Sequence, residues 1–128
     1  SKVYVANLNS ESLVAIDVAS RSAGARIPLQ QVPQEMAVTP DGRLLFVAND
    51  GSAVIVVDSE RDAEVGRIEV GAPSAGAAMA PDGSQAWFST AKGVVVVDVA
   101  GRSVAARLPE IGSAAGLDSW HLDRLARL

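Results

Sequence analysis

The stretch LLFVAND at residues 44–50 occurs in two related forms elsewhere in the sequence, as KVYVANL at 2–8 and, more weakly, as QAWFSTA at 85–91. Tyr4, Phe46 and Trp87 occupy the same place in the three copies, at steps of 42 and 41 residues. The whole chain has only two Phe, two Trp and one Tyr, so most of its aromatic side chains mark this one position. The pattern indicates an internal repeat of about 41 residues.

Three further patterns repeat with the same period. They are an apolar run ending in aspartate, at 13–17, 54–58 and 94–98; a Pro-Asp-Gly turn, at 39–42 and 80–83; and an arginine, at Arg26, Arg67 and Arg107. The steps are 40 or 41 residues in every case. Four independent patterns that agree on one period identify a repeat architecture.

The composition is that of one globular domain. The 128 residues are 48% apolar and 20% charged, which is too apolar for a disordered chain. Eleven basic and fifteen acidic side chains are interspersed and give a net charge of −4, so we expect no nucleic-acid partner. No run of about 18 apolar residues occurs, so we also expect no membrane span. The absence of cysteine excludes disulfides, thiolate zinc sites and thiol catalysis.

Each unit consists of short β-branched runs separated by turn residues, which is typical of strands. The runs 54–57 and 94–97 are apolar without interruption, so we expect both faces of these strands to be covered. The Pro-Asp-Gly segments predict hairpin turns, because Gly can take the positive φ that such turns use. For Asp17, Asp58 and Asp98 we expect the carboxylates to accept backbone N–H bonds in the following turn rather than to catalyse a reaction.

Four strands in a repeat of about 41 residues are typical of a β-propeller blade. The motifs YVAN, FVAND, LVAID, VIVVD and TPDG resemble the YVTN family of β-propeller repeats over residues 2–117. The resemblance implies an all-β fold of four-stranded antiparallel blades, about three of them in this chain, and a periplasmic or extracellular location. The third unit departs from the pattern, with Ser89 and Thr90 where the others have Ala and Asn, and so does everything after Gly116.

The family names the strands of a blade A to D, from the inside of the ring outward. In that order residues 2–7 are strand B, 12–17 strand C and 22–29 strand D of the first blade, and 34–39 form the next strand A. The chain then contains strands B to D, two complete blades, and the start of a final strand A at 114–117. The first blade is therefore expected to lack its inner strand.

The residues 118–128 do not continue the repeats of 1–117. Leucines recur there at three-residue steps, which favours a short helix, and the rival interpretation is a degenerate fourth hairpin. The only histidine, His121, lies in this tail, and we interpret it as a surface or packing residue because a metal or haem site would need several converging ligands. We expect no metal and no cofactor.

Three blades cannot close a ring, since propellers typically have about 4–8 blades. Two explanations are open. Either two chains donate terminal strands to each other and form a six-bladed homodimer, or these residues are part of a larger propeller. The expected partner is therefore a second copy of the chain or the remainder of a larger ring.

The candidate ligand residues lie in the loops that join strand D to A and strand B to C, which share the face at the mouth of a propeller channel. They are Asn7, Gln34, Glu35, Asn49 and Thr90. The alternative for Asn7 and Asn49 is a bond to the backbone of the local turn, because both occupy a repeat position. The three arginines of the repeat lie on outer strands, where we expect edge protection and solubility.

The sequence contains no nucleophile-elbow, phosphate-loop, dinucleotide or zinc-protease motif. This favours a non-catalytic β-propeller scaffold for binding or assembly. One alternative, implied by the family, is part of a lactonase-like hydrolase with an axial metal near Glu35, although the matching residue in the next repeat is Gly76. Another is a tetrapyrrole-binding electron-transfer propeller, for which one histidine supplies few axial ligands.

Overall fold

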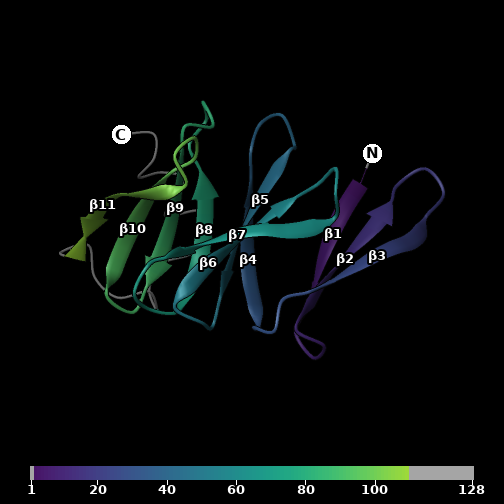
Figure 1. Cartoon of the computed structure of the whole chain (residues 1–128), viewed down its shortest axis with the longest axis horizontal. Coiled ribbons are helices and arrows are strands. Elements are labelled where there is room, and N and C mark those ends of the chain that lie inside the picture. Colours follow the sequence, from purple (N-terminus) through teal and green to yellow (C-terminus); the bar gives the residue numbers. More distant parts are fainter. Residues whose placement is uncertain (1, 110–128) are drawn as a thin grey trace.

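The computed structural model describes residues 2–109, and these form eleven strands in three antiparallel sheets (Figure 1). Each sheet is one blade. Blade 1 has three strands: β1 (Lys2–Asn7), β2 (Ser12–Asp17) and β3 (Ser22–Pro28). Blade 2 has four: β4 (Pro33–Val38), β5 (Leu44–Asn49), β6 (Ala53–Asp58) and β7 (Ala63–Glu69). Blade 3 also has four: β8 (Ser74–Met79), β9 (Gln85–Thr90), β10 (Gly93–Asp98) and β11 (Ser103–Leu108).

This arrangement confirms the predicted all-β fold and the expected strand order. The strands expected at 22–29 and 34–39 differ from β3 and β4 by one residue at their ends. The final strand A expected at 114–117, His121 and the tail lie outside the described residues. Within residues 2–109 no helix is long and apolar enough to cross a bilayer.

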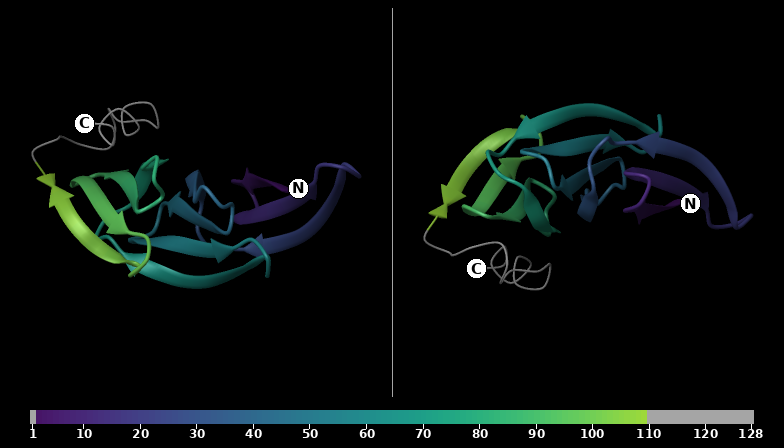
Figure 2. Two further views of the ribbon diagram at one scale, coloured as in Figure 1. Left: turned by 90° about the horizontal axis from the view of Figure 1, so that it is seen from above. Right: turned by 90° about the horizontal axis from the view of Figure 1, so that it is seen from below.

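The three blades stand side by side in an arc (Figure 2). The outer strands β3, β7 and β11 follow its convex side, and β1, β4 and β8 lie toward its concave side. Neighbouring blades touch mainly through their inner strands, because β8 packs on β4 and β5, whereas β1 packs on β4. The register of the two outermost strands shifts at one point in all three blades, so each outer strand bends in the same way.

The core consists of blade faces pressed together, and β6 contributes to both sides of it. Val54 and Val56 face blade 3 and join a cluster that contains Phe46 and Phe88, whereas Ile55 and Val57 join the cluster against blade 1. All four of these β6 side chains are fully buried, as are those of 94–97 within a few per cent. The predicted covering of both strand faces is confirmed. Each such side chain contributes about 1.5–3 kcal/mol through its burial.

The aspartates that end the central strands have the predicted role in the turns that follow. Asp17 accepts a hydrogen bond from the amide of Ser20 at 3.0 Å, and Asp98 accepts one from the amide of Gly101 at 2.7 Å. Asp58 does the same with the two amides that follow Ser59. The Ser20 hydroxyl and then its amide hold the pKa of Asp17 below its usual range, as expected for a carboxylate that accepts several donors.

The Pro-Asp-Gly segments form the predicted hairpin turns between strands A and B. Gly42 has a φ of 74° and Gly83 a φ of 77°, a conformation that other residues rarely take. Asp41 accepts the Thr39 hydroxyl at 2.6 Å and the Arg43 amide at 2.9 Å. These donors lower the pKa of Asp41, so its carboxylate is engaged in the turn.

Replacing Val56 with Asp is expected to abolish folding. The substitution would bury an unpaired carboxylate between blades 2 and 3, at a cost of several kcal/mol. Circular dichroism and the yield of folded protein test this, with Val18→Asp as the control because Val18 is 48% exposed. Folded, cooperatively unfolding Val56→Asp protein would contradict the burial of β6 on both faces.

Candidate functional site

Blade 1 has an open inner edge. Among the described residues β1 pairs only with β2, whereas β5 and β9, at the same place in the other blades, each pair with a strand on both sides. The free edge of β1 therefore presents backbone N–H and C=O groups that have no strand partner among residues 2–109. Such an edge is a template for another strand.

A groove of about 610 Å³ lies beside this edge, where blade 1 meets blade 2. Its lining comes from β1, from β4 and β5, and from two turns of blade 2: Lys2, Val3, Tyr4, Met36, Val38, Asp41, Gly42, Leu45 and Ser59. In blades 2 and 3 the corresponding place beside the second strand is filled by β4 and β8. Val38 of β4 is 46% exposed, but Met79, one repeat later, packs against blade 2. Among residues 2–109 no strand occupies this place, so the groove lies where the other two blades have an inner strand.

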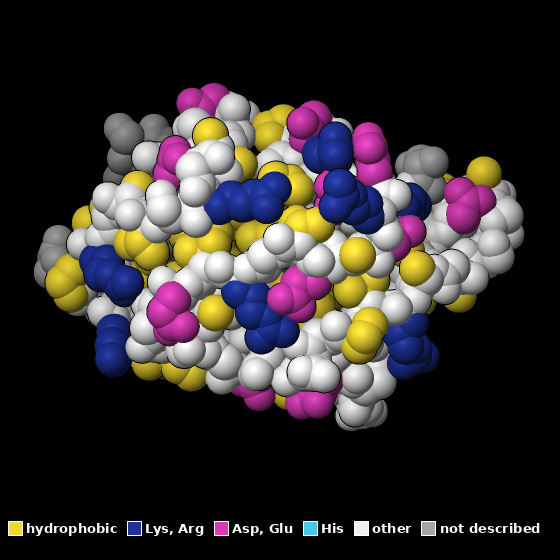
Figure 3. Space-filling view, viewed as in Figure 1, with side chains coloured by type: hydrophobic (Ala, Val, Ile, Leu, Met, Phe, Trp, Pro, Cys, Tyr) yellow, Lys and Arg dark blue, Asp and Glu magenta, His cyan; other side chains and the backbone are white. Residues whose placement is uncertain are grey.

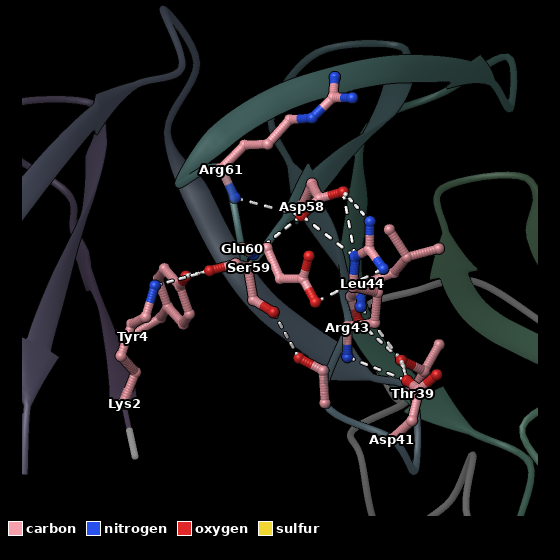
Figure 4. Close-up of polar contacts among 11 residues, drawn as sticks. Lys2, Tyr4, Thr39, Asp41, Arg43, Leu44, Asp58, Ser59, Glu60 and Arg61 are labelled. Carbon is pink, nitrogen blue, oxygen red and sulfur yellow. Dashed lines mark hydrogen bonds and ion pairs between the residues drawn. The ribbon is translucent and has the colours of Figure 1, made fainter.

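Polar contacts attach the rim of the groove to blade 2 (Figure 4). Lys2 donates hydrogen bonds to the Ser59 carbonyl at 2.6 Å and to Asp62 at 2.9 Å. The Tyr4 hydroxyl donates to the same two residues. Burial acts to raise the pKa of Asp62, but the bonds from Tyr4 and Lys2 outweigh it and hold that pKa below 3.8. Burial and then the bond to Asp62 raise the pKa of the Tyr4 hydroxyl above its usual range.

A second polar group joins two turns of blade 2 (Figure 4). Arg43, after the Pro-Asp-Gly turn, lies 3.3 Å from Asp58 and 3.6 Å from Glu60. Burial opposes the charge on Asp58, yet the amides of Glu60 and Arg61 and the guanidinium of Arg43 lower its pKa. The Asp58 carboxylate is therefore held by the turn and by Arg43.

Asn49, one of the predicted ligand residues, is fully buried. Its amide group donates to the carbonyls of Val47 at 3.1 Å and Ala53 at 2.8 Å, and its oxygen accepts the amide of Gly51 at 2.8 Å. All of these partners belong to β5, β6 or the turn between them. The contacts support the alternative that the sequence left open, a bond to the local backbone.

Asn7 and Thr90 make similar contacts at the matching turns. The Asn7 side chain accepts the amide of Ser10 at 3.3 Å. The buried hydroxyl of Thr90 donates to the carbonyl of Gly93 at 2.8 Å and accepts the amide of Lys92 at 3.1 Å. Both side chains shape the turn between strands B and C, and a role in ligand binding stays a prediction.

Gln34 and Glu35 lie on β4, next to Asn49 across the β4–β5 pair. Gln34 is exposed and Glu35 half-buried, beside a register shift that follows Pro33. The structure thus brings three of the five predicted residues together at one end of blade 2. The two other residues occupy the corresponding ends of blades 1 and 3.

Two of the repeated arginines have a contact that the sequence did not predict. Arg67 of β7 donates to the carbonyl of Leu29 in blade 1 at 3.0 Å, and Arg107 of β11 donates to the carbonyl of Val70 in blade 2 at 2.7 Å. Each carbonyl comes directly after the outer strand of the preceding blade. The sequence showed only that these arginines recur at the repeat period. Their contact with the preceding blade could not be predicted, because it depends on how the blades stack.

Charged side chains of both signs are interspersed on the face that Figure 3 shows, and lysine and arginine do not form one patch there. Among residues 2–109 no three His, Cys, Asp or Glu side chains lie close enough to hold a metal ion. Among the described residues, the unpaired edge of β1 and the groove beside it are therefore the strongest candidate for a binding site.

Comparison with solved structures identifies the class of protein. The chain is similar to a chain of the hydrazine synthase of Kuenenia stuttgartiensis, with 28% identity and a TM-score of 0.78 over 84% of this chain and 32% of the other. It is also similar to the RRP9 WD40 repeats, with 18% identity and a TM-score of 0.78 over 84% and 35%. A further match is the dihydro-heme d1 dehydrogenase NirN, with 20% identity and a TM-score of 0.69 over 84% and 25%.

These similarities establish a β-propeller fold for the described residues. The chain spans about a third of the length of the first structures that it matches. No protein-family model and no curated protein sequence matches it. The resemblance to YVTN repeats therefore stays a prediction.

Replacing Tyr4 with Phe, the residue at the same position in blade 2, is expected to lower the free energy of unfolding by about 1–2 kcal/mol at pH 7 through loss of the bond to Asp62. Because the folded-state pKa of Asp62 lies below 3.8, its contribution is present above that pH and is lost as the pH falls through the lower folded value. The difference between wild type and variant in denaturant titrations should therefore shrink in acid. A pH-independent difference would exclude Asp62 as the partner.

Replacing Arg107 with Gln removes the hydrogen bond to Val70 and is expected to lower the free energy of unfolding by about 1–2 kcal/mol. Arg21→Gln is the matched control, because Arg21 is exposed in the β2–β3 turn of blade 1. Urea titrations of both variants measure the effect. Equal stabilities of the two variants would show that the contact between blades contributes nothing.

Proposed function

We propose that this chain is a non-catalytic β-propeller scaffold whose binding element is the open inner edge of blade 1. The observation that carries the proposal is that no described strand pairs with the inner side of β1, which leaves a free backbone edge beside the groove between β1 and β4. Edge and groove are the two parts that strand addition uses. The edge supplies main-chain hydrogen bonds, and the groove receives alternate side chains.

The groove favours an extended segment with small side chains. Met36 of β4 lines the groove and packs against the cluster between blades 1 and 2, whereas its counterpart one repeat later is the small Ala77. Less room is therefore left beside Met36 than beside Ala77. Val38 adds an exposed apolar surface that a strand would cover, and about 25 cal/mol is gained for each Å² of apolar surface removed from water.

The strand that fits best by sequence is the next inner strand of the repeat, expected at 114–117 with the sequence Ala-Ala-Gly-Leu. Supplied by a second copy, it would complete blade 1, and the exchange would be reciprocal. Two chains of three blades would then form a closed six-bladed homodimer. The other source is the remainder of a larger propeller.

The mass of the full chain in solution tests this proposal. We expect a dimer of twice 13.2 kDa in sedimentation experiments. Val38→Asp should weaken the dimer at least about tenfold, because a docked strand would bury the new carboxylate without a partner. Val18→Asp, at 48% exposure against 46% for Val38, should leave it unchanged. A folded wild-type chain with the mass of one copy would contradict the homodimer and would leave the remainder of a larger propeller as the source of the strand.

A further inference from the structure

We infer that the groove accepts an extended segment that runs antiparallel to β1 with alanine or glycine opposite Tyr4, and that Met36 excludes larger residues from that position. The inference rests on the proposed function and deepens it. Strand addition alone requires a free backbone edge, whereas this selection specifies the direction, the register and one residue of the segment that the edge accepts.

The two complete blades show how an inner strand pairs with its neighbour. β4 runs antiparallel to β5, and β8 runs antiparallel to β9. In both pairs the register shifts between the first and the third residue of the inner strand. β1 has the same place in blade 1 as β5 and β9 have in theirs, so a strand added to β1 is expected to take the same direction and register.

A small residue lies opposite the repeated aromatic residue in both blades. Ala37 pairs with Phe46, and Ala78 pairs with Trp87. Tyr4 is the aromatic residue of blade 1 at this position. The residue of an added strand that pairs with Tyr4 is therefore the counterpart of Ala37 and Ala78.

Met36 is a side chain that this residue would contact. Between blades 2 and 3, Ala37 of β4 and Ala77 of β8 are buried in one cluster. Met36 has in β4 the place that Ala77 has in β8, and it lines the groove. Where blade 2 sets alanine against alanine, an added strand would set its residue opposite Tyr4 against methionine. The larger side chain on β4 leaves room for only a small residue in the added strand.

Val38 belongs to the same contact. Its counterpart Met79 packs against the cluster that contains Ala37. Val38 is 46% exposed, and no inner strand lies beside it among residues 2–109. The residue opposite Tyr4 would lie against Met36 and Val38, as Ala37 lies in the interface with blade 3. This continuity with the interface between blades 2 and 3 identifies the occupant as an inner propeller strand with a small residue at this position.

Binding of a fluorescently labelled peptide to the full chain, followed by anisotropy, tests the inference. The probe is the chain's own β8 segment, residues 71–81. Ala78→Leu in the peptide should raise the dissociation constant about five- to a hundredfold, because overpacking a filled site is destabilising. Ala75→Leu, at a position that is exposed in β8, is the matched control and should change it less than about threefold. A peptide of the reversed sequence controls for binding by composition alone.

Two variants of the chain test the part that Met36 has in the selection. Met36→Ala should bind the Ala78→Leu peptide within about threefold of the unmodified one, whereas Met36→Leu, which nearly keeps the volume, should keep the discrimination. Melting curves check that both variants fold. A competing second copy would raise the dissociation constants of all peptides for one chain by the same factor, so the ratio between peptides is the measured quantity.

The outcomes separate the two proposals. Equal affinity of the wild-type chain for the unmodified and Ala78→Leu peptides, equal binding of the reversed sequence, or discrimination that survives Met36→Ala would overturn this inference and leave strand addition standing. A wild-type chain that binds none of the peptides would overturn strand addition at β1 itself.

Discussion

Packing of apolar strand faces between neighbouring blades is the interaction on which this structure depends. β6 is buried on both sides, with Val56 against blade 3 and Ile55 against blade 1. The apolar core of the middle blade therefore lies in its two interfaces with the neighbouring blades, and each interface needs side chains from both blades. The same requirement makes blade 1 conspicuous, because Val3 and Val5 repeat the interface pattern on a face with no neighbouring blade among the described residues.

Polar contacts then fix the turns within each blade and the alignment of neighbouring blades. Within a blade, Asp17, Asp58 and Asp98 each organise the turn after a central strand through backbone amides. Between blades, Arg67 and Arg107 bond to main-chain carbonyls, which are available whatever the side chain at the acceptor position. A backbone acceptor lets the same arginine work at each successive interface although the sequences of the repeats differ.

Strand positions, turn chemistry and the burial of 54–57 could be predicted because they depend on neighbours in sequence: apolar runs, Gly with positive φ and aspartate beside free amides. The candidate ligand residues were harder to interpret. Asn49 is polar and lies at a turn, as a ligand residue would. Its side chain, however, makes three hydrogen bonds to the local backbone. The bonds from Lys2 and Tyr4 to Asp62 span about half the chain and carried no sequence signal.

The sequence by itself determined the period, the four-stranded unit and the order of the strands, in which residues 2–109 supply no inner strand to the first blade, since each follows from short-range patterns that recur at 40 to 42 residues. Only the tertiary structure decided which faces meet, that a groove is left between β1 and β4, and that the repeated arginines join blades. The physical reason is that these features depend on how twisted sheets stack. Stacking brings Arg67 and Leu29 within 3.0 Å although 38 residues separate them.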